Sequence, residues 1–213
     1  MKTDDLITLL SADVEPVDHR WLVRTIGAAV AAGATVAVAA AVLALGPRSG
    51  VTDLAALAPV LLKIAFALAA LIPASIFLMR LARPGGERRM SVPLVVLPFV
   101  AIVLLAALSL AMAPSSHWSG MVTGHNWLEC AISIPLIAVV PFALLTWAVR
   151  RAAPTDLART GALAGLVAGA LSAAGYALHC VDDSVPFVAV WYGGTIALCT
   201  FAGWKLGPRL LRW

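Results

Sequence analysis

Long apolar runs of about 20 residues alternate with short polar links along this chain of 213 residues. An α-helix needs roughly 20 apolar residues to cross the hydrocarbon core of a bilayer. The six runs are 21–45, 57–79, 92–113, 128–149, 160–179 and 187–206. The pattern predicts an all-α integral membrane protein, with a bundle of six transmembrane helices over residues 21–206.

Composition supports the same class of protein. Hydrophobic residues make up 62% of the chain and charged residues 12%, whereas soluble domains are about half apolar and a quarter charged. The short links leave no room for a second folded domain. An acidic segment precedes the first run, and the run is longer than the core of a signal peptide, so we interpret it as a retained helix.

The basic residues predict the orientation of the bundle. Of the 15 lysines and arginines, all but Arg48 and Lys63 fall in the terminal segments or in the links on one side. An excess of positive charge in short links marks the cytoplasmic side, so both termini are expected in the cytoplasm, with residues 207–213 as a tail. The net charge of +4 then reflects orientation and contact with anionic membrane lipid. No direct contact with nucleic acid is expected.

Lys63 lies inside the second apolar run, six residues from its outer end. Its long side chain is expected to extend outward to the membrane surface. A contact with Glu129, at a similar depth, is a weaker alternative.

Residues 1–20 are the one sizeable segment outside the apolar runs. They predict a short amphipathic helix whose acidic and leucine positions follow helical spacing: Asp4, Asp5, Leu6, Leu9, Leu10 and Asp13. Anionic lipid repels an acidic helix, so a passive position on the membrane is the less favoured interpretation. A leucine stripe flanked by carboxylates better suits the groove of a basic partner protein.

Three glycines in the fifth run recur at four-residue spacing. Gly161, Gly165 and Gly169 give this helix a face without side chains. Such faces let two membrane helices approach closely, so this helix is expected to pack tightly against a neighbour.

Polar and sulfur-containing residues gather at the outer ends of the fourth and fifth runs: His125, Glu129, Cys130, His179, Cys180, Asp182 and Asp183. A short link joins these two runs, which are expected to be antiparallel neighbours. Cys130 and Cys180 would then meet near the outer surface.

Three interpretations of the cysteine pair remain open. The thiols could form a structural disulfide, they could be a redox-responsive or soft-metal site, or these could be unconnected polar residues at a wet interface. Neither CxxC nor HExxH occurs in the chain, so no local motif supports a metal site.

Two other classes of function were weighed. A small transporter or channel needs polar groups near the middle of the membrane, and Lys63 and Glu129 both lie toward the outer edge. A membrane thiol oxidoreductase would have only one outward cysteine pair and no obvious route for electrons. The chain is therefore not expected to be an enzyme.

Several segments resemble one known family, the NrsF-type anti-sigma factors: MKTDDLITLLSADVEPV, NWLEC, YALHCVDD, PFVAVWY and GPRLLRW. The resemblance covers essentially the whole chain. It implies a multi-pass protein of the bacterial inner membrane that holds an extracytoplasmic-function sigma factor inactive at its cytoplasmic side. The leucines and carboxylates of residues 1–20 would bind that sigma factor.

The resemblance also implies a role for the outer cysteines. Cys130 and Cys180 would be needed to respond to heavy-metal or oxidative stress. No permanent cofactor is expected, and a soft or heavy metal ion bound by the two cysteines would be the signal.

Overall fold

The computed structural model describes residues 3, 5, 7, 19–48, 54–83, 92–152 and 154–212, and every regular element among them is helical. Six helical stretches are long and apolar enough to cross a membrane: Arg20–Leu45, Leu57–Leu81, Pro93–Met112, Ser115–Arg150, Leu157–Tyr176 and Val185–Leu210. The predicted number of helices that are long and apolar enough to cross a membrane is confirmed, and the fourth stretch, Ser115–Arg150, is longer than the predicted run 128–149.

The spans differ in how many helical pieces build them. The elements in order are α2 (His19–Ala40), the π-helical turn η1 (Ala41–Leu45), α3 (Leu54–Leu81), α4 (Val92–Met112), the 3₁₀ turn η3 (Ser115–His117), α5 (Trp118–Thr123), α6 (Trp127–Arg150), α7 (Leu157–Tyr176), α8 (Val185–Phe187), the π-helical turn η4 (Val188–Tyr192) and α9 (Gly193–Leu210). Turn η1 extends α2, and α8, η4 and α9 together form the last span.

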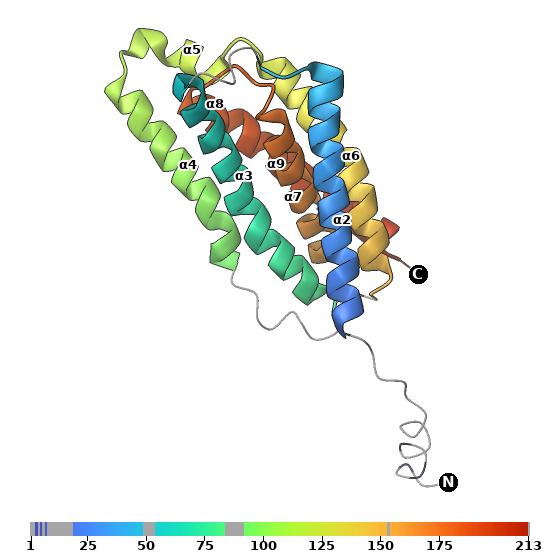
Figure 1. Cartoon of the computed structure of the whole chain (residues 1–213). Coiled ribbons are helices and arrows are strands. Elements are labelled where there is room, and N and C mark those ends of the chain that lie inside the picture. The colour runs from blue at the N-terminus through green and yellow to red at the C-terminus, as the bar shows by residue number, and fades with distance from the viewer. Residues whose placement is uncertain are drawn as a thin grey trace.

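Helix α7 is the central element of the bundle (Figure 1). Most of its residues are buried, and it packs against α2, α3, α6 and α9. The predicted antiparallel pairing of the fourth and fifth spans is confirmed by the contact between α6 and α7. Helix α4 lies at the edge, with an exposed row of leucines that includes Leu97, Leu104 and Leu108.

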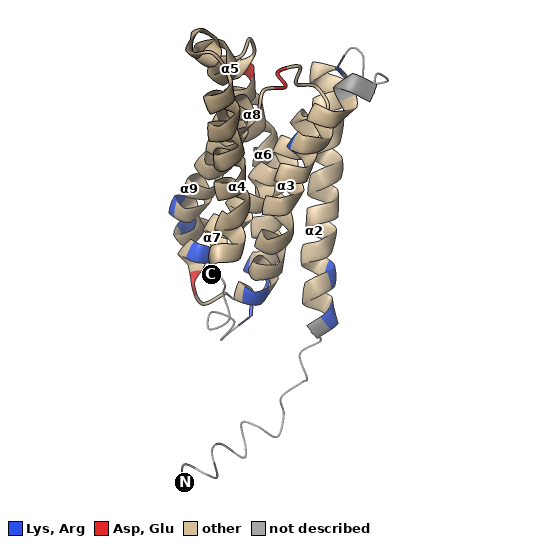
Figure 2. Ribbon diagram, turned by 90° about the vertical axis from the view of Figure 1, so that its left-hand side faces the viewer, with Lys and Arg blue, Asp and Glu red and all other residues tan. Residues whose placement is uncertain are grey.

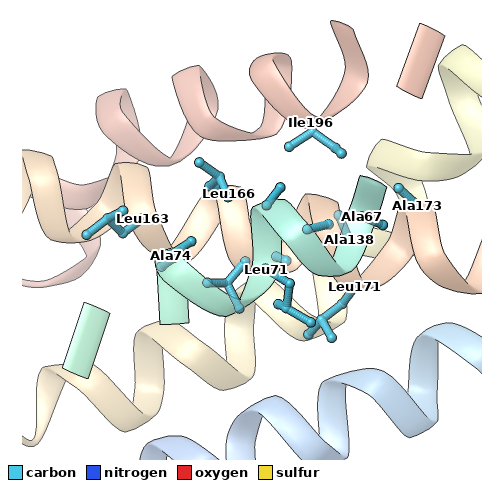
Figure 3. Close-up of a cluster of buried hydrophobic side chains, with 14 of the residues drawn as sticks. Ala67, Leu71, Ala74, Ala138, Leu163, Leu166, Leu171, Ala173 and Ile196 are labelled. Carbon is cyan, nitrogen blue, oxygen red and sulfur yellow. The ribbon is translucent and has the colours of Figure 1, made fainter. Parts of the chain in front are cut away.

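The core between these helices is built from small and medium-sized apolar side chains (Figure 3). Leu71 and Ala74 of α3 lie beside Leu166 and Leu171 of α7, and Ile196 joins them from α9. Dispersion contacts between closely packed side chains stabilise such an interior.

The glycine face of α7 is buried against α9, as its spacing predicted. A β-carbon added at Gly161 would collide with the carbonyl oxygen of Gly203, and one at Gly165 with that of Cys199. Without side chains at these positions, the two backbones come into direct contact.

Positive charge is concentrated at one end of the bundle (Figure 2). This end holds the start of α2 and the end of α9, and the arginines there lie at or just beyond helix ends; they include Arg20, Arg24, Arg80, Arg150, Arg151, Arg159 and Arg209. Arg48 and Lys63 lie toward the opposite end, where both contact Asp183 in the segment between α7 and α8. The charge asymmetry that the sequence predicted is therefore also present in three dimensions.

Candidate functional site

The end of the bundle opposite the arginines holds the candidate site. A connecting segment, residues 178–184, joins α7 to α8 there and carries Cys180. Cys130 lies in the first turn of the neighbouring helix α6. The structure therefore places both cysteines at the same end of the bundle, as the sequence predicted.

Both thiols are free and buried. Cys130 and Cys180 have no exposed surface, and both belong to the apolar core, which also contains Tyr176 and Tyr192. Cys180 follows α7 and Cys130 lies in the first turn of α6, and these two helices pack together. Their expected position at the outer surface is corrected in one respect: the connecting segment folds over them, so reagents do not meet them directly.

Cys199 is separate from this pair. It lies in α9, partly buried, and packs against Gly169 of α7. It behaves as a small apolar side chain at a tight helix crossing, which is the usual role of an isolated buried cysteine.

Asp183 holds the connecting segment in place through two cations. The guanidinium of Arg48 donates to both carboxylate oxygens of Asp183, each at 2.6 Å, and the ammonium of Lys63 donates to Oδ1 at 2.9 Å. Both cations also donate to the carbonyl oxygen of Cys180, Lys63 at 3.0 Å and Arg48 at 3.4 Å. We call Arg48, Lys63 and Asp183 the Asp183 clamp.

The clamp corrects the expectation for Lys63. Its side chain has no exposed surface and points to Asp183, neither outward to the membrane surface nor toward Glu129. A buried ammonium needs a counter-charge, and Asp183 supplies one within the protein. A partner 120 positions away leaves no local signal in the sequence.

The clamp brings two positively charged groups to one carboxylate. Burial raises the pKa of the Asp183 carboxyl, but the hydrogen bonds from Arg48 and Lys63 outweigh burial and hold this pKa below its usual value. The hydrogen bond to Asp183 raises the pKa of Arg48. Two cations face one carboxylate, so the clamp carries a net positive charge beside the thiols.

His179 joins the connecting segment to two further elements. Its Nδ1 lies 2.8 Å from the carbonyl oxygen of Gly46, just after η1, and its Nε2 lies 2.9 Å from Oε1 of Glu129 in α6. A carbonyl can only accept, so Nδ1 carries a proton. The second contact then requires a proton on either Nε2 or Glu129.

Asp182 fixes the start of α6. Its carboxylate accepts hydrogen bonds from the backbone N–H groups of His125, at 3.1 and 3.2 Å, and Asn126, at 2.8 Å. Negative charge is favourable at the N-terminal end of a helix. The ring of His125 is almost fully exposed at 3.7 Å from Asp182, so His125 lies at the rim of the site.

Gly124 allows this close approach. Its φ of +60° lies in the left-handed region, and an added β-carbon would lie 2.7 Å from the ring of Phe187 and 2.8 Å from the carboxyl carbon of Asp182. Only glycine fits both the backbone conformation and the space.

Two more contacts hold the connecting segment and η4 against α5. Ser184 donates from its hydroxyl to the carbonyl oxygen of Met121, and the indole of Trp191 donates to that of Val122 at 2.9 Å. The sequence analysis predicted neither contact, because the partners are 63 and 69 positions apart. Helix α8 itself packs against α4 and α5.

Metal coordination by the protein alone is limited. Among the described ranges, no group of three or more histidine, cysteine, aspartate or glutamate side chains is placed to hold a metal ion. His179 and Glu129 are engaged with each other, so Cys130 and Cys180 remain as the soft ligands. Thiolate suits soft ions such as Cu(I) and Zn(II).

The predicted partner-binding residues fall largely outside the described part of the chain. Asp4, Leu6, Leu9, Leu10 and Asp13 belong to the residues that the structure does not describe. Asp5 is helical and exposed, as are Thr3 and Ile7.

Comparison with known proteins points to one family. The family model NrsF, negative regulator of sigma F, matches residues 10–213. A probable anti-sigma-F factor NrsF of Azospira oryzae is 32% identical over 215 residues, and an anti-sigma-F factor NrsF of Caulobacter vibrioides is 32% identical over 222 residues. Each alignment covers the full length of both proteins. No solved structure matches the chain.

Proposed function

The chain belongs to the NrsF family of negative regulators of sigma F, and from this premise we propose that it is an inner-membrane anti-sigma factor controlled by its two buried cysteines. It binds an extracytoplasmic-function sigma factor on the cytoplasmic side. It releases that sigma factor when heavy metal or oxidant reaches Cys130 and Cys180 from the periplasm.

The positions of charge support this orientation. The arginine-rich end carries the start of α2 and therefore the segment that precedes it, whereas the cysteines lie at the other end. Under the positive-inside rule, the arginine-rich end faces the cytoplasm. Residues 1–20 are then within reach of a sigma factor, whose basic DNA-binding surface would meet Asp4, Asp5 and Asp13 while Leu6, Leu9 and Leu10 fill a groove.

The observation that carries the sensing half of the proposal is the position of the two thiols. Cys130 and Cys180 are free and lie at adjoining ends of the packed helices α6 and α7. An inert disulfide would have no chemistry left to respond with. Two reduced thiols at the ends of neighbouring helices can be joined by a signal.

Joining the thiols has a defined chemistry. An oxidant removes two electrons as the two S–H bonds are lost and one S–S bond forms, and two protons leave. A soft metal ion displaces the same two protons and links the thiolates, with further ligands from solvent or solute. Either product draws the start of α6 toward the end of α7.

The energy required is consistent with covalent or metal–thiolate bonds. Reversing a two-state equilibrium from 1:99 to 99:1 takes a preference of roughly 5.5 kcal/mol for the second state. One ordinary hydrogen bond contributes about 1 kcal/mol, which is too little. Metal–thiolate bonds and disulfides are strong enough to supply this difference.

The transporter interpretation gains no support from the site. Lys63, a buried charged group inside a span, is paired with Asp183 at one end of the bundle. A transport site would place such a group free to bind its substrate near the middle of the membrane.

The sensing half is tested with a reporter gene driven by the sigma factor. Cells carry the native protein, the Cys130→Ser/Cys180→Ser variant or the matched control Cys199→Ser, and are treated with a soft metal salt or the thiol oxidant diamide. We expect induction with the native protein and the control, and continued repression with the double variant. Full induction with the double variant would show that the response does not require the two cysteines.

The binding half is tested separately with a pull-down. The full-length protein in detergent should retain the sigma factor, and its Leu6→Ala/Leu9→Ala/Leu10→Ala variant should not. If the triple variant retains as much sigma factor as the native protein, the binding surface lies elsewhere.

A further inference from the structure

The connecting segment cannot move while the Asp183 clamp is closed. The carbonyl oxygen of Cys180 accepts from both cations of the clamp, and the backbone N–H of Arg48 donates to the carbonyl oxygen of Leu178 at 3.0 Å. The cations belong to the link after η1 and to α3, whereas Cys180 follows α7. The clamp therefore ties three parts of the bundle together across the thiol.

The buried charge of Lys63 also favours two discrete states of the clamp, closed and fully rearranged, over a series of partly open states. If Asp183 swings out, the ammonium of Lys63 loses its counter-charge while it is still buried. An unpaired buried charge is strongly unfavourable, so opening has to carry Lys63 to solvent or to another partner. A closed clamp and a rearranged one are separated by states of high free energy.

We propose that the Asp183 clamp is the gate of the thiol site: closed, it shields Cys130 and Cys180, and its opening sets how fast a thiol-reactive signal reaches them. This rests on the proposed sensing function. In this role Arg48, Lys63 and Asp183 are positioning residues, which control the access of the signal without binding it.

The gate is tested by alkylation of the native cysteines with a small maleimide in isolated membranes, read at each cysteine by mass spectrometry. Asp183→Asn removes the counter-charge of Lys63 at nearly constant shape. We expect Cys180 to be alkylated at least about tenfold faster in this variant than in the native protein, which corresponds to about 1.4 kcal/mol in the opening equilibrium. Arg48→Gln keeps the pair of Lys63 and Asp183 and should give an intermediate rate.

The matched control is Asp156→Asn. Asp156 caps the other end of α7, where its carboxylate accepts from the N–H of Arg159 at 2.9 Å. This variant loses a carboxylate of similar exposure but leaves the clamp intact, so its cysteines should react at the native rate. Equal rates in Asp183→Asn and the native protein would overturn the gate. An equal increase in the alkylation rate of the control would show that faster alkylation comes from a general loss of stability, and this result would also overturn the gate.

The alkylation rate measures how accessible the cysteines are, and this measurement does not depend on whether the protein senses a signal. The cysteine reporter experiment can therefore fail while the gate is supported, or succeed while the gate fails. If Asp183→Asn does not accumulate in membranes, Arg48→Gln alone decides: its Cys180 must react faster than the native cysteine for the gate to stand.

A second inference concerns the other end of the bundle and rests on different residues. A groove of about 450 Å³ runs between α2 and α6 at the arginine-rich end. Its lining includes Trp21 and Arg24 of α2, Trp147 of α6 and Arg151 just after α6, together with alanines of α2 such as Ala28. The guanidinium of Arg151 stacks on Trp147 at 3.9 Å from the ring centre.

The geometry points to an anionic phospholipid as the occupant of this groove. Basic pockets between membrane helices on the cytoplasmic side attract anionic headgroups, and tryptophans favour the same depth. The two guanidinium groups would bind the phosphate while an acyl chain lies over the alanines of α2. This inference rests on the proposed membrane location but not on sensing or sigma binding.

The lipid site is tested by thermal unfolding of the full-length protein in detergent. Added phosphatidylglycerol should raise the melting temperature more than phosphatidylcholine or inorganic phosphate does. Arg24→Ala/Arg151→Ala should abolish that preference, whereas Arg150→Ala, which removes an exposed arginine of the same turn outside the groove, should keep it. An equal response to the two lipids, or an unchanged preference in the double variant, would overturn the site.

Discussion

The ammonium of Lys63 lies 2.9 Å from the carboxylate of Asp183, although the two residues are 120 positions apart in the chain. The side chain of Lys63 has no exposed surface, whereas that of Asp183 is 30% exposed and also bonded to Arg48. If Lys63 is removed, Asp183 keeps its ion pair with Arg48 and its contact with solvent. If Asp183 is removed, Lys63 keeps no partner of opposite charge among the described residues.

This asymmetry predicts unequal stability losses. Asp183→Asn leaves a buried ammonium without its counter-charge and should lower the free energy of unfolding by about 3 kcal/mol. Lys63→Met leaves Asp183 paired with Arg48 and should cost only about 1 kcal/mol. Denaturant unfolding in mild detergent measures both, and equal losses would contradict the assignment of Lys63 as the dependent partner.

Helices α7 and α9 pack closely through glycines, and this contact predicts that one added methyl group destabilises the protein at some glycines but not at others. Gly165→Ala pushes a β-carbon into the carbonyl group of Cys199 and should destabilise the protein by about 1–3 kcal/mol. Gly194→Ala in α9 is the matched control, because nothing lies within 4 Å of its added β-carbon. The control should be neutral or slightly stabilising, since alanine is the better helix former. Similar losses at the two sites would refute the close crossing.

The clamp predicts a stability change only in acid. Asp183 has its pKa lowered from 3.8 in the folded protein, so it stabilises the fold fully above about pH 3.8 and loses this contribution as the pH falls through its folded pKa. The difference in stability between the native protein and Asp183→Asn should therefore be constant from pH 7 to pH 5 and shrink below pH 3.8.

The comparison with Asp183→Asn is needed because other groups share this end. Arg48 and Lys63 are the charged groups that face Asp183, and Asp182, Glu129 and His179 are the further titratable side chains nearby. The contributions of Asp182, Glu129 and His179, which do not bond to Asp183, are common to both proteins and cancel in the difference. A difference that already shrinks near pH 6 would assign the pH dependence to a group other than Asp183.

The helices and their closest contact could be predicted from sequence because their signals are local. Apolar runs set the six spans, and the four-residue spacing of Gly161, Gly165 and Gly169 identified the face that meets α9. The end shared by Cys130 and Cys180 followed from the antiparallel pairing of α6 and α7.

The interior of the site could not be predicted, because it depends on contacts between distant segments. Lysine near a membrane surface can extend outward or find a carboxylate, and only the folding back of the connecting segment brings Asp183 to Lys63. The burial of both thiols depends on the same fold. In the sequence, Arg48 is an exception to the excess of basic residues on one side of the bundle. Its bidentate contact with Asp183 explains why it lies at the other end.

The central claim is that the thiol site and the sigma-binding segment lie on opposite sides of the inner membrane, and thiol labelling tests it most directly. In a protein without its three native cysteines, His125→Cys marks the rim of the thiol site, since His125 is almost fully exposed, and Asp5→Cys marks the N-terminal segment. A membrane-impermeant maleimide added to intact spheroplasts should label the first variant at once and the second only after permeabilisation. Labelling of both positions before permeabilisation, or of neither, would contradict the account.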